Sequence, residues 1–238
     1  MNFLLINDDG IDAPGLAALL QCASGLGAAV VTAAPKQQLS GCGHQVTTKE
    51  PIKAEELPPT APHEIKRWAI HGTPADCARL ALSTLCPENG MSIDWVLSGI
   101  NAGGNLGADV YTSGTVAAAR EAAFFGIPGV AVSHHRKRGE IDWSLAQAHA
   151  LEALRRVLPR PRRPDAYWNV NLPHRAPHLP PPEIIDCPLD TNPIEVLFRP
   201  TADASYLYAG KYRDRPRTPG ADVAVCFAGN TSISELTL

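Results

Sequence analysis

The sequence predicts an α/β protein with a three-layer, Rossmann-like and mainly parallel sheet, followed by a C-terminal β-hairpin extension. Over roughly the first 135 residues, short apolar runs alternate with segments of helical periodicity, which is typical of successive βαβ units. Such units connect in a right-handed sense and place helices on both faces of the sheet. We assign residues 1–173 to this domain and residues 174–238 to the extension.

The expected elements of the first domain follow one another in a regular order. Buried parallel strands are expected at the apolar runs Phe3–Ile6, Ala28–Ala34, Asp94–Ser98, Gly129–Ser133 and Tyr167–Leu172. Helices are expected where apolar residues recur every three or four positions, at Pro14–Ser24, Pro74–Leu85, Ser113–Phe125 and Ile141–Leu158. A basic, proline-punctuated connector at 159–164 follows the last of these helices.

The tail has a different pattern. A proline-rich stretch at 176–188 precedes strand candidates at Glu195–Phe198, Ser205–Tyr208, Asp222–Phe227 and Ser232–Leu236, and we find no helix signal there. Such hairpin material is too thin to bury a core of its own. We therefore expect it to pack onto the main domain or onto another subunit.

Composition excludes several classes of protein. The apolar share of 45% is ordinary for a globular chain of 238 residues, and the net charge of -3 argues against a stable nucleic-acid partner or a membrane-surface protein. No apolar run approaches the ~20 residues of a membrane-spanning helix. Because the first strand is expected to start at Phe3, we expect no signal peptide before it, and the six cysteines lack a metal-binding spacing. We expect a cytoplasmic protein with reduced thiols.

Asp8 and Asp9 directly follow the first strand, at the sheet edge where open α/β proteins bind ligands. Two adjacent carboxylates repel each other and lose solvation, so a divalent metal is the expected neutralising partner. The alternative is that Asp9 or Asp12 only caps the next helix, which has Pro14 in its first turn. We assign the capping role to Asp12 and a metal or catalytic role to the Asp8–Asp9 pair.

The loop Ser40–His44 follows the second strand. Gly41 and Gly43 would allow backbone N–H groups to approach an anion, and Ser40 offers a hydroxyl to a metal or phosphate, although a plain tight turn is the alternative. Cys42 is expected to be a small filler residue rather than a reactive thiol. His44 is either a phosphate or base contact or an ordinary solvated loop residue.

A glycine-rich loop, residues 98–107, follows the strand at Asp94–Ser98. The amide oxygen of Asn101 suits a hard cation such as Mg²⁺, whereas Asn105 fits a turn-forming role better. The segment Ser113–Thr115 then opens an alanine-rich helix, and a helix N-terminus can bind an anion or simply be capped. Asp76 is interpreted as structural, because it stabilises the start of its own helix.

Because these loops follow different parallel strands, they should converge on one edge of the sheet. Two carboxylates, a hydroxyl and an amide oxygen would surround a hard metal, beside glycine loops and a helix N-terminus for an anion. This combination is typical of metal-assisted hydrolysis of phosphate esters.

The motifs NDDGIDAPG, SG-x-G, GTPADC-x-RLAL, VLSGINAGGNLG, SGTVAAAREA and NVNLP occur in this order. In this respect the chain resembles the SurE family of divalent-metal-dependent 5'/3'-nucleotidases, which act on nucleoside monophosphates. The resemblance spans most of residues 2–173. It implies a Rossmann-like domain whose C-terminal hairpin is exchanged between the subunits of a homodimer or homotetramer.

The resemblance also implies functional residues. One divalent metal per subunit, Mg²⁺ or Mn²⁺, would be held by Asp8, Asp9, Ser40 and Asn101. The phosphate would lie near Gly41, Asn101, Ser113, Gly114 and Thr115, with Gly43 in the same loop. Three departures from the family pattern bear on substrate preference and oligomer contacts: Thr112 before SGT, His44-Gln45 after SG-x-G, and Ser232–Leu236 in the tail.

In the resulting hypothesis Asp8 orients or deprotonates the attacking water, and an aspartyl-phosphate intermediate is disfavoured because no DxDxT-like pattern is present. An acyl-phosphate receiver would need an aspartate where Asn101 stands, and a Rossmann oxidoreductase would need GxGxxG after the first strand. A metal-dependent glycosyltransferase is the third alternative. The basic cluster Lys211, Arg213, Arg215 and Arg217 is interpreted as a solvated hairpin rather than a substrate contact from a partner subunit.

Overall fold

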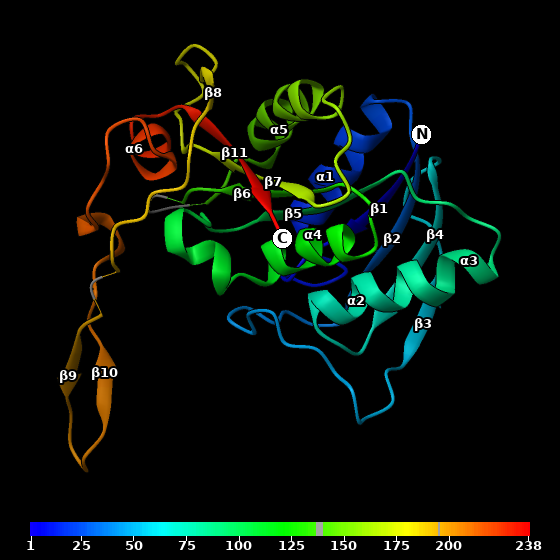
Figure 1. Ribbon diagram of the computed structural model, residues 1–238, viewed down its shortest axis with the longest axis horizontal. Helices are drawn as coiled ribbons and strands as arrows, with labels where there is room; N and C mark the ends of the chain where they lie inside the picture. Colours follow the sequence, from blue (N-terminus) through cyan, green and yellow to red (C-terminus); the bar gives the residue numbers. More distant parts are fainter. Residues whose placement is uncertain (137–139, 195) are drawn as a thin grey trace.

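The computed structural model describes residues 1–136, 140–194 and 196–238, and confirms a mainly parallel sheet between two layers of helices (Figure 1). Within these residues the main sheet has the order β3-β4-β2-β1-β5-β6-β7-β11-β8. Its parallel strands are β4 (Glu64–Ile70), β2 (Ala29–Pro35), β1 (Asn2–Ile6), β5 (Trp95–Asn101), β6 (Gly129–His134) and β7 (Ala166–Leu172). From β1 the chain builds first toward β2 and later toward β5, so the strand order reverses beside β1, where such folds bind ligands.

The central strand shows how the two helical layers are packed. Phe3 and Leu5 contribute to the core beneath α1 (Pro14–Gly25) and α5 (Trp143–Val157). Leu4 and Ile6 contribute to the core on the opposite face, beneath α2 (Pro74–Leu80) and α4 (Gly114–Phe124). All four side chains are fully buried, because both faces of the strand are covered. No helix in the described part of the chain combines the length and apolar character needed to cross a membrane.

The region between β2 and β5 departs from the expected pattern. The helix expected at Pro74–Leu85 consists of α2, a π-helical turn at Ala81–Leu85 and the short α3 (Cys86–Glu88). The strands β3 (Ala54–Leu57) and β4 were not predicted. Strand β4 was missed because its charged residues interrupt the apolar pattern of a buried strand. Its Glu64 can nevertheless be buried, because Thr32 and Thr60 donate hydrogen bonds to the carboxylate.

Part of the tail joins the main sheet. The strand expected at Ser232–Leu236 is confirmed as β11 (Thr231–Thr237), which pairs antiparallel with β7, and the unpredicted β8 (Ile184–Asp186) lies beside it. The strand expected at Ser205–Tyr208 corresponds to β10 (Tyr206–Tyr208), which pairs with β9 (Phe198–Pro200) in a hairpin that projects from the body (Figure 1). The strand expected at Glu195–Phe198 overlaps β9 at its last residue, while Glu195 lies outside the described residues.

The strand prediction at Asp222–Phe227 is wrong, because this segment forms helix α6 (Asp222–Phe227). The expectation of a tail without helices is therefore also wrong, and a 3₁₀ turn occurs at Tyr212–Asp214. A short apolar run does not distinguish a strand from a helix by its periodicity. Here tertiary contacts of Asp222 favour the helix over a strand. Its buried carboxylate accepts hydrogen bonds from the N–H groups of Gly107 (2.7 Å), Asp190 (2.7 Å) and Val223 (2.8 Å).

The substitution Asp222→Asn tests this anchor. It would place an amide NH₂ against a backbone N–H group and leave one buried donor without an acceptor. We expect the free energy of unfolding to fall by about 2 kcal/mol, as measured by urea denaturation. The exposed Asp214 offers a matched control, because Asp214→Asn should change stability by less than about 0.5 kcal/mol. Equal stability of the two variants would contradict the assignment.

Candidate functional site

The turn after β1 brings the first two loops of the site together. Asn7 closes the turn by donating its side-chain amide to the Gly10 carbonyl (2.8 Å) and accepting from the Gly10 N–H group (3.2 Å). Gly10 has a φ of +104°, and a Cβ atom there would lie 3.3 Å from the backbone of Gln37 and Gln38. Glycine therefore allows the loop after β2 to pass closely. The N–H group of Leu39 then donates to the backbone carbonyl of Asp8, at 2.8 Å.

Asp8 is buried, with 5% of its surface exposed. Burial raises the pKa of Asp8 to about 6; the adjacent Asp9 charge adds to this rise, and a hydrogen bond from the Thr115 hydroxyl (2.6 Å) opposes it. In the described chain the side-chain partners of both carboxylates are neutral donors: Thr115 for Asp8, and the Gln38 amide and Ala102 N–H group for Asp9. The pair thus lacks a compensating cation from the described residues.

Asp9 connects the loops after β2 and β5. The Gln38 amide nitrogen lies 3.3 Å from Asp9 Oδ1 and 2.9 Å from Ser40 Oγ, so these two oxygens face the same small volume. The Ala102 N–H group donates to Asp9 Oδ2 at 3.1 Å, which places the neighbouring Asn101 at the same edge. Sequence reasoning missed Gln38, because an exposed glutamine in a loop follows no pattern of its own.

The donor set fits a hard divalent cation. Asp8, Asp9, Ser40 and Asn101 belong to loops joined by the hydrogen bonds just described, and carboxylate, hydroxyl and amide oxygens suit Mg²⁺ or Mn²⁺. Asn101 donates its amide nitrogen to the Gly103 carbonyl (2.8 Å), which fixes the orientation of its amide oxygen. The described residues contain no group of three or more His, Cys, Asp or Glu side chains suited to a metal. A cation here would therefore use the neutral oxygens as well as the two carboxylates.

The start of α4 lies against this acidic pair. A Cβ atom on Gly114 would be 3.1 Å from the Cβ of Asp8 and 3.2 Å from Cys42 Sγ, so glycine permits the close approach of the helix. The Ser113 hydroxyl caps the helix by accepting from the Val116 N–H group (3.1 Å), as in the simpler alternative considered for it. The Thr115 hydroxyl is committed to Asp8, so the donors that remain for an anion include the backbone N–H groups of the first turn and the Ser113 hydroxyl.

The last residue of the Ser40–His44 loop, His44, anchors that loop to α4. His44 Nε2 lies 2.6 Å from Glu121, and Arg120 lies 3.0 Å from His44 Nδ1, which places the imidazole proton on Nε2 when the ring is neutral. Glu121 also receives a hydrogen bond from Arg79 at 2.8 Å. Both ring nitrogens of His44 are therefore paired within the protein, which differs from the solvated loop residue of one alternative. The role of a phosphate or base contact stays a prediction.

Cys42 of the Ser40–His44 loop and Asp76 at the start of α2 behave as small or structural residues. Burial raises the pKa of the Cys42 thiol, and the charge of Asp8 adds to the rise, so the thiol is neutral and fits the filler role. Gly41 and Gly43 both have positive φ angles, of 81° and 61°. Asp76 forms a capping box with Thr73, which confirms the structural interpretation of Asp76.

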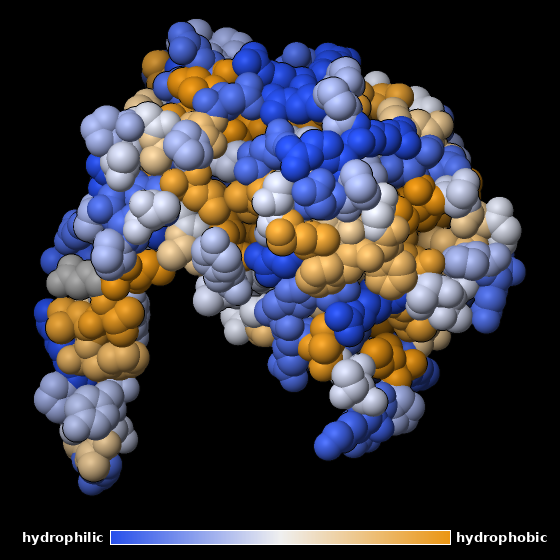
Figure 2. Space-filling view, viewed as in Figure 1, coloured by the Kyte–Doolittle hydropathy of each residue, from blue (hydrophilic) through white to orange (hydrophobic). Residues whose placement is uncertain are grey.

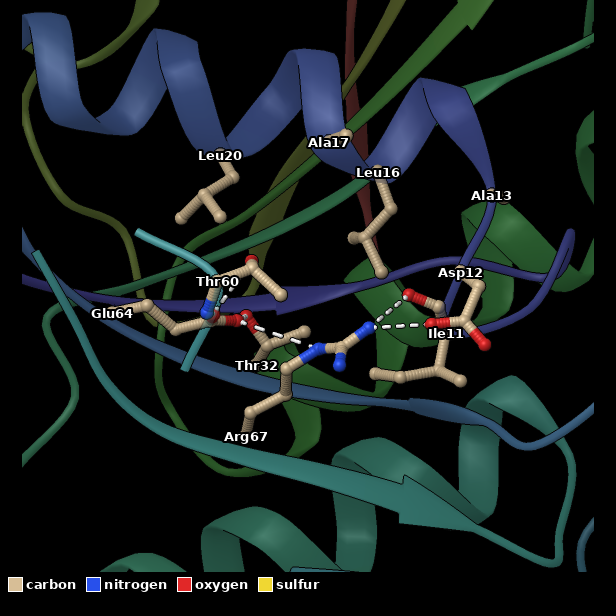
Figure 3. Close-up of a pocket in the computed structure, with 10 residues that line it drawn as sticks. All are labelled: Ile11, Asp12, Ala13, Leu16, Ala17, Leu20, Thr32, Thr60, Glu64 and Arg67. Carbon is tan, nitrogen blue, oxygen red and sulfur yellow. Dashed lines mark hydrogen bonds and ion pairs between the residues drawn. The ribbon is translucent and has the colours of Figure 1, made fainter. Parts of the chain in front are cut away.

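The capping role predicted for Asp12 is wrong. Figure 3 shows its carboxylate directed at the guanidinium of Arg67, with an N–O distance of 2.7 Å, and the same nitrogen donates to the Ile11 carbonyl at 3.1 Å. The N-cap of α1 is Ala13, which has no side-chain cap. The partner comes from β4, a strand that the sequence pattern did not reveal. A cavity of about 220 Å³ lies beside this ion pair, between α1 and strands β2 and β4.

Asn105 also differs from expectation, since it is buried and joins its loop to β6 and β7 by hydrogen bonds, rather than being a simple turn former. Its side chain donates to Ser133 (2.7 Å), and its carbonyl accepts from Asn169 (2.7 Å) and Asn171 (3.0 Å) of β7. The NVN asparagines therefore hold the loop that begins with Asn101.

Within the basic segment 211–217, Arg215 lies against that same loop rather than on the projecting hairpin. It binds Asp109 (2.7 Å) and the Leu106 carbonyl (3.2 Å). The guanidinium of Arg217 lies 4.3 Å from the ring centroid of Phe227 in α6. The expectation of a solvated hairpin is wrong for Arg215, whereas Lys211, Arg213 and Arg217 are exposed.

Comparison with known proteins agrees with this arrangement. The sequence model of the family described as "Survival protein SurE" matches residues 3–187. A Nostoc protein (strain PCC 7120) named provisionally as a 5'-nucleotidase is 49% identical over 237 residues, covering 99% of each chain. The 5'-nucleotidase SurE of Clostridium botulinum (strain ATCC 19397 / Type A) is 41% identical over 174 residues, covering 73% of this chain and 67% of that protein.

The fold is likewise similar to a solved structure. The crystal structure of the SurE protein from Aquifex aeolicus superimposes with a TM-score of 0.80 and 30% sequence identity, covering 100% of this chain and 93% of that one. The family match extends across most of the chain and includes all the loops of the site. These findings together show that the chain belongs to the SurE family.

Proposed function

We propose that the protein is a divalent-metal-dependent phosphatase that hydrolyses nucleoside 5'- and 3'-monophosphates to nucleoside and phosphate. The observation that carries the proposal is the Asp8–Asp9 pair, in which Asp8 is buried, which has only neutral donors around it in the described chain and lies against the first turn of α4. Membership of a family whose relatives are named 5'-nucleotidases supports the same reaction.

One Mg²⁺ or Mn²⁺ would be held by Asp8, Asp9, Ser40 and Asn101, whose loops already meet at this edge. When bound, such a metal neutralises phosphate charge and lowers the pKa of a water molecule. The need for it follows from the chain itself, because two neighbouring carboxylates beside an anionic substrate would otherwise repel that substrate.

The remaining steps belong to residues of the chain. Asp8 orients the attacking water and accepts its proton, and the Thr115 hydroxyl fixes the orientation of the Asp8 carboxylate. The N–H groups of the Gly41–Gly43 loop, together with those of Gly114 and Thr115 at the helix start, hold the phosphoryl oxygens as negative charge develops. Ser113 keeps that helix start in place through its capping bond.

The projecting hairpin β9–β10 supports assembly into a homodimer or homotetramer by strand exchange. Figure 2 shows hydrophobic residues along the arm, and its exposed large side chains are Ile194, Val196, Leu197, Phe198, Tyr206, Leu207 and Tyr208. An apolar arm of this kind is a surface that a second copy of the chain would cover. A cytoplasmic location is also part of the proposal, supported by six free cysteines that suit a reducing compartment.

A phosphate-release panel tests the reaction. The purified protein should release phosphate from nucleoside monophosphates when Mg²⁺ or Mn²⁺ is present, EDTA should abolish the release, and added metal should restore it. Activity that persists after exhaustive metal removal would contradict the proposed metal dependence. Failure to hydrolyse any nucleoside monophosphate with any divalent metal would contradict the proposed substrate class.

Asp9→Asn tests the role of the acidic pair. Loss of one carboxylate charge should lower kcat/KM by more than about a hundredfold, because even residues behind metal ligands contribute 10–100-fold. The matched control is Asp12→Asn, since Asp12 pairs with Arg67 outside the site and should leave activity within about threefold. Circular dichroism should report folded protein for both variants. Wild-type activity in folded Asp9→Asn protein would exclude this site.

Deleting the hairpin tests the proposed assembly. The Ala209 N–H group donates to the Leu197 carbonyl (2.7 Å), so residues 198–208 can be replaced by a short glycine-serine linker at the base of the hairpin. Light scattering should give two or four chains for the full protein and a smaller assembly for the deletion. An unchanged mass would place the subunit interface elsewhere.

A further inference from the structure

A cleft of about 380 Å³ opens beside the acidic pair, at the carboxyl ends of β2 and β4. One wall is the segment that follows β2, from Lys36 to Leu39. The second wall is the loop from Cys42 to Thr47, and the third is the junction between β4 and α2. The cleft therefore lies at the sheet edge where the proposed reaction takes place.

Two of the lining residues touch the proposed reaction centre. Leu39 donates its N–H group to the backbone carbonyl of Asp8 at 2.8 Å. Cys42 lines the cleft, and its sulfur packs against Gly114 at the first turn of α4. A phosphate bound at that helix turn would therefore lie next to the wall that Cys42 contributes to the cleft.

The polar side chains that border the cleft already have partners. Lys36 lies 2.9 Å from Glu55 Oε2, and His71 (3.0 Å) and Lys53 (2.7 Å) lie beside Glu55 Oε1. The hydroxyl groups of Thr47 and Thr73 are likewise committed, to Asp76 and to the Gln45 carbonyl. Because the lysine and the hydroxyl groups of the lining are paired in this way, the cleft suits a neutral group.

Two side-chain amides remain for recognition, those of Gln37 and Gln45. Both residues are exposed at the cleft, and their amides form no side-chain hydrogen bond with the described residues. An amide carries donors and an acceptor, which matches the mixed hydrogen-bonding edges of a nucleobase.

A second cavity on the other side of Asp9 is less suitable. Its volume is about 210 Å³, and it is lined by Asp9, Gln38 and Trp143 among others. Sites for small organic ligands begin at about 300 Å³, so the larger cleft can hold a nucleoside and the smaller cavity is too tight.

We propose that the cleft between the β2 and β4 ends binds the nucleoside part of the substrate, with Gln45 and Gln37 as the residues that contact the base. This assignment rests on the proposed function, because it places the leaving nucleoside next to the phosphate. It identifies Gln45 as a specificity-determining residue rather than a catalytic one.

Gln45→Trp, which fills the cleft from its exposed rim, tests the assignment with two readouts. The first is saturation transfer from the protein to adenosine, measured by NMR without added metal. The second is the ratio of kcat/KM for AMP to kcat/KM for p-nitrophenyl phosphate, which has no nucleoside. We expect the adenosine signal to be lost and the ratio to fall at least tenfold. Gln21→Trp on the exposed face of α1 is the matched control and should change neither readout.

The two proposals fail in different ways. Unchanged adenosine transfer in Gln45→Trp, or no transfer from the wild-type protein, would overturn the cleft assignment even if AMP were hydrolysed. Loss of transfer in Gln45→Trp from a protein that hydrolyses no monophosphate would uphold the cleft and overturn the reaction.

Discussion

Two neighbouring carboxylates at the end of β1 set the arrangement of the whole site. Asp8 receives the Thr115 hydroxyl from α4, and Asp9 receives the Ala102 N–H group from the loop after β5. The Gln38 amide adds the loop after β2. Because each carboxylate attracts donors, the pair draws three separate loops together. The mutual repulsion of the two carboxylates is relieved only in part by these neutral donors, which favours a cation at this position.

A layer of charged residues behind these loops keeps them in place. Glu121 is almost fully buried, and the hydrogen bonds from His44 and Arg79 outweigh its burial and lower its pKa. Through His44 the Ser40–His44 loop is fixed to α4, the helix whose first turn faces Asp8. Asp76 does the same for the start of α2, where Thr47 donates both its N–H and its hydroxyl group to the carboxylate. Removing one partner from such buried networks is costly, since the other is left unpaired.

The C-terminal tail has two parts with different surroundings. Strand β11 and helix α6 pack on the main domain, where Asp222 and the β7 asparagines hold the loop that carries Asn101. The β9–β10 hairpin instead leaves the body with its apolar side chains exposed. One segment thus supports the site from within the subunit, while the other leaves exposed the apolar side chains on which the proposed assembly rests.

The sequence alone determined the strands β1, β2, β5, β6 and β7 and the loops that meet at Asp8 and Asp9. Fully buried strands give uninterrupted apolar runs, and the carboxyl ends of parallel strands lie along one edge, so local pattern was sufficient. Only the tertiary structure decided the partners of these residues. Asp12 turns to Arg67 of an unrecognised strand, and His44 turns to Glu121. The segment Asp222–Phe227 is a helix because the Asp222 carboxylate accepts hydrogen bonds from distant backbone N–H groups. Such partners lie tens of residues away, and a hydrogen bond between distant residues leaves no periodic trace in the sequence.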